Sequence, residues 1–255
     1  PAWYLLRPAP AIAFANRDWV VVGDLRNATG QTTFDDSLET AFRIALEQSR
    51  YVNVLPDLKV RETVKLMERD PDKTRGDRAG GAEGSLRDGA RALILPTVAE
   101  IGGHVRITAE VVDPRTQTTV YSESADGIGA QSVLASVDQV NRQLRERLGE
   151  AMATVSANSR PLEKVATKNL DALRVYSLGL GQEAKGKFAD AVAFFRQALQ
   201  FDPEFGAVHL QLGRIDAGMG RNADARHEFE LALAKPDRLA NRDRLLASAQ
   251  LASIE

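Results

Sequence analysis

The 255-residue sequence contains no cysteine, which excludes disulfide bonds, thiol catalysis and thiolate metal sites together. This absence also suits an oxidising compartment. No apolar run approaches the roughly 20 residues of a membrane-spanning helix. The 33 Lys and Arg nearly balance the 35 Asp and Glu, so the chain lacks the concentrated positive charge typical of proteins that bind nucleic acid. We expect folded globular domains that do not bind nucleic acid.

Recognisable catalytic and metal-binding motifs are missing as well. The three histidines, His104, His209 and His227, do not have the spacing of metal ligands relative to one another or to carboxylates. No G-x-S-x-G elbow, H-E-x-x-H pair or protein-kinase signature occurs. We therefore predict that the protein is not an enzyme and that it holds neither a cofactor nor a metal.

The last hundred residues contain an internal repeat with a period of 34 residues. Its identical pairs are Leu178 and Leu212, Gly179 and Gly213, Gly186 and Gly220, Ala191 and Ala225, Phe195 and Phe229, Ala198 and Ala232, and Leu199 and Leu233. Each unit is typical of two helices that are joined by a glycine turn and stopped by a proline, Pro203 or Pro236. The small residues permit close approach of the two helices, and the phenylalanines fill the space between them.

The pattern resembles the tetratricopeptide repeat. The resemblance covers Asp171 to about Asp237, and a third, truncated unit begins in "RLANRDRLLASAQLASIE". Each unit departs from the family pattern at one position early in its first helix. An aromatic residue is expected there, but the first copy has Val175 and the second has His209. The resemblance implies two full repeats and a third, truncated one over residues 171–255.

The resemblance also implies a groove that binds a protein or peptide partner. The groove positions of the family fall on Leu173, Tyr176, Leu180, Glu183, Leu210, Arg214 and Ala217. Tyr176 and Arg214 are of the residue types that most often dominate protein interfaces. In the alternative interpretation these side chains pack against the preceding domain.

The earlier part of the chain predicts an α/β domain, a mixed sheet with flanking helices, over residues 19–155. Short apolar runs at 19–22 and 51–56 indicate strands, and the first is followed by a helix over 36–50, begun by a capping box of Asp36 and Glu39. The polar, glycine-rich stretch 69–84 predicts a loop without core residues. Residues 90–124 predict an antiparallel meander, which is followed by a helix with an apolar stripe that starts at Val133.

A loop after the first strand, "GDLRNATGQTTF", looks at first like a phosphate-binding turn. It has neither the lysine of a P-loop nor a G-x-G-x-x-G pattern. We expect a strand-to-helix turn in which Asn27 and Thr29 bond to the local backbone and Gly30 has a positive φ. In the alternative, Asn27, Thr29 and Asp35 contact a small ligand at the carboxyl end of the strand.

The strings "RNATG" and "FDDSL" after the first strand, with "EVVDPRT" in the meander, resemble the TolB amino-terminal-like domain over roughly Trp19 to Met152. In that family such a domain precedes tetratricopeptide repeats in bacterial transmembrane regulators, as in CadC-like regulators, membrane-linked serine/threonine kinases and peptide-modification-system nucleotide cyclases. The resemblance implies a juxtamembrane arm (1–18), a linker (156–170) and a non-enzymatic periplasmic sensor, tethered to the inner membrane by an upstream span.

Such a sensor is expected to report an occupied groove by a changed angle between its domains or by the pairing of two protomers as a homodimer. The alternative of a soluble cytoplasmic scaffold, which only gathers partners, also stays open.

Overall fold

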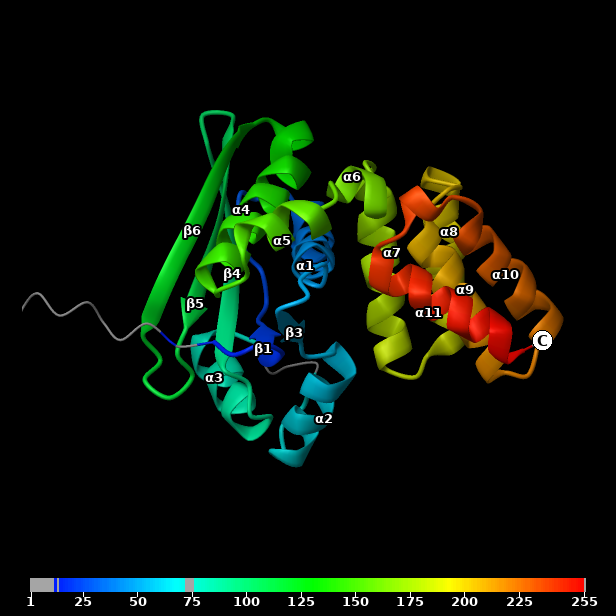
Figure 1. Ribbon diagram of the computed structural model, residues 1–255, viewed down its shortest axis with the longest axis horizontal. Coiled ribbons are helices and arrows are strands. Elements are labelled where there is room, and N and C mark those ends of the chain that lie inside the picture. Colours follow the sequence, from blue (N-terminus) through cyan, green and yellow to red (C-terminus); the bar gives the residue numbers. More distant parts are fainter. Residues whose placement is uncertain (1–11, 13, 72–75, 255) are drawn as a thin grey trace, which may run out of the picture. The chain divides into compact units, whose positions relative to one another are not determined.

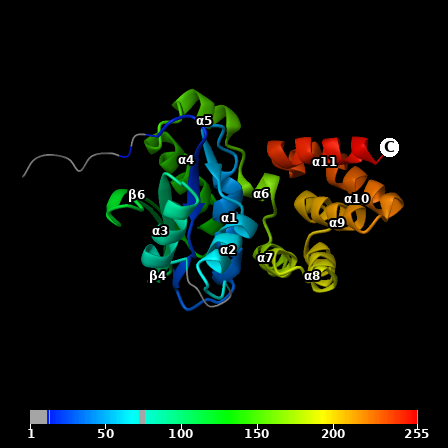
Figure 2. The same cartoon turned by 90° about the horizontal axis from the view of Figure 1, so that it is seen from below.

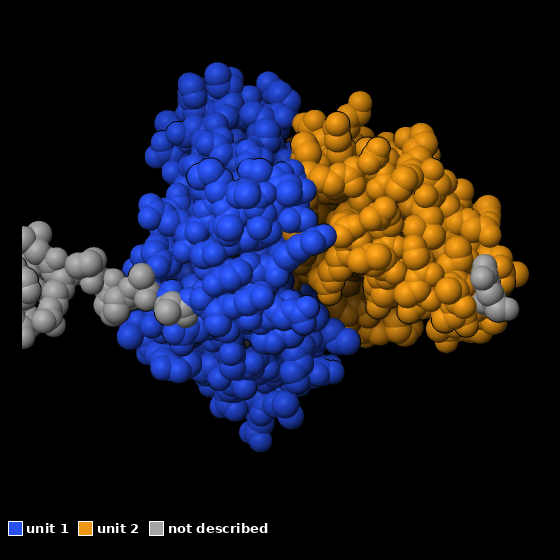
Figure 3. All heavy atoms as spheres, in the orientation of Figure 1, with its two compact units in different colours: residues 1–30, 49–159 blue, residues 31–48, 160–255 orange. Residues whose placement is uncertain are grey.

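The protein is described here from a computed structural model that covers residues 12, 14–71 and 76–254. The predicted juxtamembrane arm therefore lies mostly outside the described residues. The chain forms two compact units, unit 1 (residues 1–30 and 49–159) and unit 2 (residues 31–48 and 160–255), which Figure 3 colours separately. Residues 31–48, which were expected in the α/β domain, cluster with the repeats.

Unit 1 is an α/β unit built on one mixed sheet (Figure 1). Its elements are β1 (Asp18–Val22), β2 (Arg26–Ala28), β3 (Val52–Val54), α2 (Asp57–Leu66), α3 (Arg78–Arg87), β4 (Ala92–Ile101), β5 (His104–Val112), β6 (Thr119–Ile128), a short turn η2 (Ala130–Ser132), α4 (Val133–Arg147) and α5 (Met152–Asn158).

The sheet has the strand order β3-β1-β4-β5-β6, and β2 also pairs with β4. The pairings β1–β3, β1–β4 and β2–β4 are parallel, whereas β4–β5 and β5–β6 are antiparallel. The predicted meander is confirmed, with its first turn at Gly102 and Gly103, which both have positive φ. Residues 26–28, which were expected in a loop, form the short strand β2.

Buried and more exposed side chains alternate along β5, and the buried ones belong to the core of this unit. Val105, Ile107, Ala109 and Val111 are buried, while the residues between them are exposed or half-buried. The helix α4 packs against β5 and β6, and its buried stripe includes Val133, Val137, Val140 and Leu144, as the apolar spacing predicted. The buried side chains of β5, which recur every second residue, and those of α4, which recur with the 3.6-residue helical period, therefore form one apolar layer.

Two further local predictions are wrong. Residues 78–84 were expected in a loop without core residues, but they belong to the helix α3. Gly81, Ala82 and Ser85 of this helix are buried, because small residues allow the helix to approach the sheet closely. A Cβ at Gly81 would lie 2.8 Å from the Leu93 side chain. The first long helix begins at Phe34 rather than Asp36, and no side chain caps it, so the capping box does not form.

A buried ion pair holds the end of α4 to the chain that leaves unit 1. Arg145 donates from Nε and Nη2 to both carboxylate oxygens of Glu150, at 2.8 and 2.9 Å, and from Nη1 to Ser159. The Ser49 hydroxyl donates to the same carboxylate. Burial by itself would raise the pKa of Glu150, but the hydrogen bonds from Arg145 and Ser49 outweigh it and lower that pKa. A buried carboxylate needs such partners to remain charged.

Unit 2 is helical. Its elements are α1 (Phe34–Leu46), α6 (Leu162–Val165), α7 (Leu170–Ala184), α8 (Phe188–Phe201), α9 (Gly206–Gly218), α10 (Asn222–Ala234), a short turn η3 (Pro236–Arg238) and α11 (Asn241–Ser253). The pairs α7–α8 and α9–α10 follow one another, and α11 comes next (Figure 2). Within the described residues, no helix combines the length and the apolar character needed to cross a membrane.

The spacing between the helices of each pair depends on a glycine. A Cβ at Gly179 would lie 2.4 Å from the ring of Phe195, and one at Gly213 would lie 2.6 Å from the ring of Phe229. Both rings are fully buried. The turns between the helices contain Gly186, with φ +74°, and its counterpart Gly220 in the second pair, with φ +73°. The predicted two-helix units are therefore confirmed in their packing and in their turns.

The helix α1 extends the stack of repeats on its amino-terminal side. It packs against α7, where the hydroxyls of Thr40 and Ser177 lie 2.6 Å apart and Ser177 donates to the backbone carbonyl of Asp36 at 2.9 Å. More than a hundred residues separate α1 from α7 in the chain. The sequence periodicity, which relates only neighbouring segments, did not predict this contact.

We predict that Gly179→Ala destabilises the protein by about 1–3 kcal/mol, because the added methyl group must displace a buried ring in a packed interface. The matched control is Gly181→Ala in the same helix, where a Cβ meets nothing within 4 Å. That exposed change should stabilise the helix by about 0.5–1 kcal/mol. Thermal and urea unfolding followed by circular dichroism measure both. Equal stability of the two variants would contradict the close-approach role of Gly179.

Candidate functional site

The first helices of the repeats, α7, α9 and α11, converge on a pocket of about 550 Å³ near their carboxyl ends. We call it the repeat pocket. It is lined by Glu183, Phe188, Arg214, Ile215, Ala217, Gly218, Met219, Gln250, Ser253 and Ile254. All of these residues belong to unit 2. The pocket combines an apolar lining with one acidic and one basic side chain, a combination typical of binding sites for a partner's side chain.

Three of the seven predicted groove residues, Glu183, Arg214 and Ala217, line the repeat pocket. Leu180 is half-buried. Leu173, Tyr176 and Leu210 are at most 5% exposed and therefore offer little surface to a partner. The predicted groove is thus filled by its own side chains at one end and open at the other.

Tyr176 shows why that end is filled. Its ring packs against Phe205, with centroids 4.9 Å apart, and against Phe195, with centroids 5.7 Å apart. Burial, first of all, and the nearby carboxylate of Asp243 raise the pKa of the Tyr176 hydroxyl far above its usual range, so it stays protonated. At this position the aromatic residue that was expected to bind a partner joins an aromatic cluster.

Glu183 and Arg214 give the repeat pocket its charge. Their nearest charged atoms lie 3.9 Å apart, and the Arg214 side chain is 43% exposed whereas that of Glu183 is 20% exposed. Arg214 also donates to Gln211 at 2.6 Å. Burial raises the pKa of Glu183 although Arg214 opposes this shift. A long, partly exposed ion pair of this kind contributes little to stability, so both groups are available to a ligand at small cost.

The prediction from the sequence missed most of the apolar lining. Phe188 begins α8 directly after the glycine turn, Met219 follows α9, and Ile254 follows α11. Phe188 and Met219 flank the turns between helices, and their exposed fractions of 44% and 46% are high for large apolar side chains. Large apolar residues beside Gly186 and Gly220 were the available signal in the sequence, but the contribution of α11 depends on how the repeats stack.

The loop after β1 forms the expected turn. The side-chain carbonyl of Asn27 accepts from the backbone N–H of Thr29 at 2.9 Å and from its hydroxyl at 2.7 Å. Gly30 has φ +75°. Asp35 belongs to unit 2, where it lies in the first turn of α1. The local bonds of Asn27 and Thr29 favour the turn interpretation over a ligand contact.

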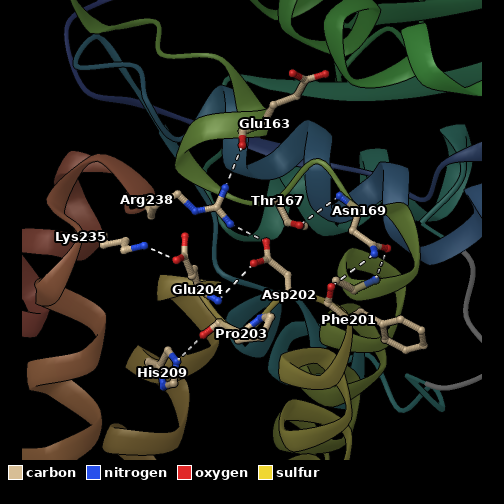
Figure 4. A network of polar contacts seen from close by, with 11 residues as sticks. Glu163, Thr167, Asn169, Phe201, Asp202, Pro203, Glu204, His209, Lys235 and Arg238 are labelled. Atoms are coloured by element: carbon tan, nitrogen blue, oxygen red, sulfur yellow. Dashed lines mark hydrogen bonds and ion pairs between the residues drawn. The ribbon is translucent and has the colours of Figure 1, made fainter.

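A polar network joins the loops at one end of unit 2 (Figure 4). Arg238 donates to the backbone carbonyl of Glu163 at 3.1 Å and pairs with Asp202. Lys235 pairs with Glu204 across the same loops. These contacts tie the segment before α7 to the α8–α9 and α10–α11 connections, so the network serves the stacking of the repeats.

His209 replaces an aromatic residue of the repeat pattern and lies in this region. Its Nδ1 is 2.7 Å from a carboxylate oxygen of Glu228. Its Nε2 is 3.2 Å from the backbone carbonyl of Pro203 (Figure 4). Both neighbours are acceptors, so the ring can satisfy both only when both nitrogens carry protons. Burial lowers the pKa of His209, but the hydrogen bonds to Glu228 and Pro203 outweigh it, and the net shift is upward.

The described residues contain no group of three or more His, Cys, Asp or Glu side chains arranged to hold a metal ion. His104 lies beside the β4–β5 turn, and His227 is exposed on α10.

One family model matches part of unit 2. Residues 183–249 match a family model described as tetratricopeptide repeat, which confirms the repeat prediction for that part of the chain. A comparison with the curated proteins finds no match.

Three solved structures are similar to part of this chain. The LpoB C-terminal domain from Salmonella enterica is 11% identical with a TM-score of 0.41, over 47% of this chain and 93% of that one. A PelC dodecamer from Paraburkholderia phytofirmans is 18% identical with a TM-score of 0.36, over 56% and 96%. TolB from Acinetobacter baumannii is 10% identical with a TM-score of 0.32, over 53% and 29%. At these TM-scores the likeness carries no argument about function.

We predict that His209 stabilises the fold in a pH-dependent way. Because its folded-state pKa is raised, its contribution is fully present below the unfolded pKa of about 6.5 and is lost as the pH rises through the folded pKa. The stability of the wild type relative to His209→Gln should therefore fall by roughly 1 kcal/mol between about pH 5.5 and about pH 8.5. Urea unfolding across this range measures it. The stability of the wild type relative to His227→Gln, a change on the exposed surface of α10, should stay constant over this range. A similar fall in that difference would refute the assignment to His209.

Proposed function

We propose that the protein is a non-enzymatic interaction module whose repeat pocket binds an extended peptide or a helix of a protein partner. The observation that carries the proposal is the pair Glu183 and Arg214, which lies among apolar walls where three successive first helices end. The match of residues 183–249 to the tetratricopeptide repeat supports the same class, since these repeats act through protein contacts.

The chemistry of the pocket defines the expected ligand. Phe188, Ile215, Met219 and Ile254 suit an apolar side chain, and fully burying one such side chain contributes about 1.5–3 kcal/mol. Arg214 would donate to a carboxylate of the ligand, while Glu183 would accept from a basic group of the ligand. We therefore expect a segment that carries one large apolar residue next to a charged one.

The cellular role that we propose is an extracytoplasmic sensor, tethered to the inner membrane in a longer signalling protein. The resemblance of "RNATG", "FDDSL" and "EVVDPRT" to the TolB amino-terminal-like domain supports this role. The absence of cysteine agrees with an oxidising compartment. In this proposal, binding at the repeat pocket is the signal, and a change in the pairing of protomers conveys it.

The repeat pocket is tested by selecting ligands from a display library of random peptides and measuring their affinity by fluorescence anisotropy. Arg214→Glu should weaken the selected peptides at least about tenfold, because it replaces the exposed basic group of the pocket by an acidic one. The matched control is Arg196→Glu, the same charge reversal at an exposed position of α8 outside the pocket lining.

Wild-type affinity in the control, together with loss in Arg214→Glu, supports the proposal. If no peptide binds, or if both variants bind equally well, the pocket is not the partner site. Circular dichroism of the variants ensures that a loss of binding is not a loss of folding.

A further inference from the structure

The strand β6 forms one edge of the sheet in unit 1. Among the described residues it pairs only with β5, so the backbone N–H and C=O groups on its other side have no strand partner. Figure 1 shows it at the border of the sheet. It is ten residues long, from Thr119 to Ile128, whereas strands of five or six residues are most common. A long free edge is a template for another strand.

The usual protections of an edge strand are missing from β6. Its sequence, TVYSESADGI, contains no proline, lysine or arginine. Its bulge lies at the Val111/Val112 end of the pairing with β5, so the stretch from Tyr121 to Ile128 is regular. Each of its two acidic residues forms an ion pair within the chain, Glu123 with Arg147 at 2.8 Å and Asp126 with Arg106 at 2.6 Å.

The possible registers between β6 and a second copy of the same strand differ in the charges that they bring together and in the length that they pair. Opposite residues in an antiparallel pair share a face of the sheet, so a two-fold axis must pass through a residue of the strand. An axis at Glu123 or Asp126 would place two like charges opposite each other, which is destabilising. An axis at Ser124 avoids this and pairs residues 120–128, whereas an axis at Ala125 would pair only 122–128 and one at Ser122 only 119–125.

In that register the remaining residues also match. Tyr121 lies opposite Gly127 of the second copy, which has no side chain of its own, and Ser132 fills the space above that glycine. Ser122 lies opposite Asp126 of the second copy, and a hydroxyl can donate there to a carboxylate. Ile128, which is 67% exposed, lies opposite Val120 of the second copy.

We propose that two copies of this protein pair through their β6 strands, antiparallel, with the two-fold axis at Ser124. The two sheets then join into one continuous sheet, and the interface is made mainly of backbone hydrogen bonds. It uses none of the residues of the repeat pocket, so the dimer and the proposed peptide site succeed or fail separately.

The absence of native cysteine allows a direct test by cross-linking the full chain. Ser124→Cys would place two thiols on directly opposite residues, whose Cα atoms lie about 4.5–5.5 Å apart, within the range that a disulfide spans. The matched control is Ser122→Cys, an exposed residue on the same face of the same strand. Its thiols would be four residues apart along the pair, about 13 Å, and could not join.

Mild oxidation, followed by non-reducing gel electrophoresis, should convert most of the Ser124→Cys protein to a covalent dimer and little of the Ser122→Cys protein. Equal cross-linking of the two variants, or none, would overturn the proposed register.

Sedimentation equilibrium supplies an independent measurement. Ser124→Lys should weaken dimerisation at least about tenfold, because it creates a like-charge pair on the axis. Ser122→Lys should leave dimerisation intact, because the new charge faces Asp126 of the second copy. If the wild-type protein stays monomeric at about 100 µM, the dimer is refuted. The dimer is also refuted if a different protein is found to pair with the β6 edge. The exposure of both serines makes these variants compatible with folding.

Discussion

The contact between a glycine and a phenylalanine ring sets the distance between the helices of each repeat. Gly179 faces Phe195 and Gly213 faces Phe229, each so closely that a methyl group would not fit without movement. The aromatic cluster of Tyr176 and Phe205 and the spacing of the first helices depend on these contacts. The repeat pocket forms where those helices end, so the placement of Glu183 beside Arg214 also depends on them.

Polar bonds fix the chain within each unit at the point where it passes from one to the other. Ser159 is held in unit 1 by the buried Arg145, which is paired with Glu150. The next residue, Arg160, is held in unit 2, where its backbone N–H donates to the Gln48 side chain at 2.7 Å and its guanidinium pairs with Asp237. Adjacent residues thus anchor in different units, and the buried carboxylate of Glu150 stays charged because its partners outweigh the cost of burial.

The two proposed interaction surfaces differ in the physical basis of recognition. The repeat pocket would recognise side chains, through apolar walls and the pair Glu183 and Arg214. The β6 edge would recognise backbone, with the register set by the charges of Glu123 and Asp126. Recognition of side chains gives specificity for a sequence, whereas edge pairing with an identical strand gives symmetry.

The sequence by itself determined those helices and strands whose buried residues recur at a regular spacing. The 34-residue spacing of glycine, alanine and phenylalanine predicted the two-helix repeats, and the alternation from Val105 to Val111 predicted the meander, because both patterns record which face of a local segment is buried. The helix α3 escaped prediction because its buried residues are glycine, alanine and serine, which carry no apolar signal. Only the tertiary structure decided that α1 packs against α7, that Leu173, Tyr176 and Leu210 are buried, and that α11 completes the repeat pocket. Each of these depends on contacts between segments far apart in the chain, and local periodicity does not record such contacts.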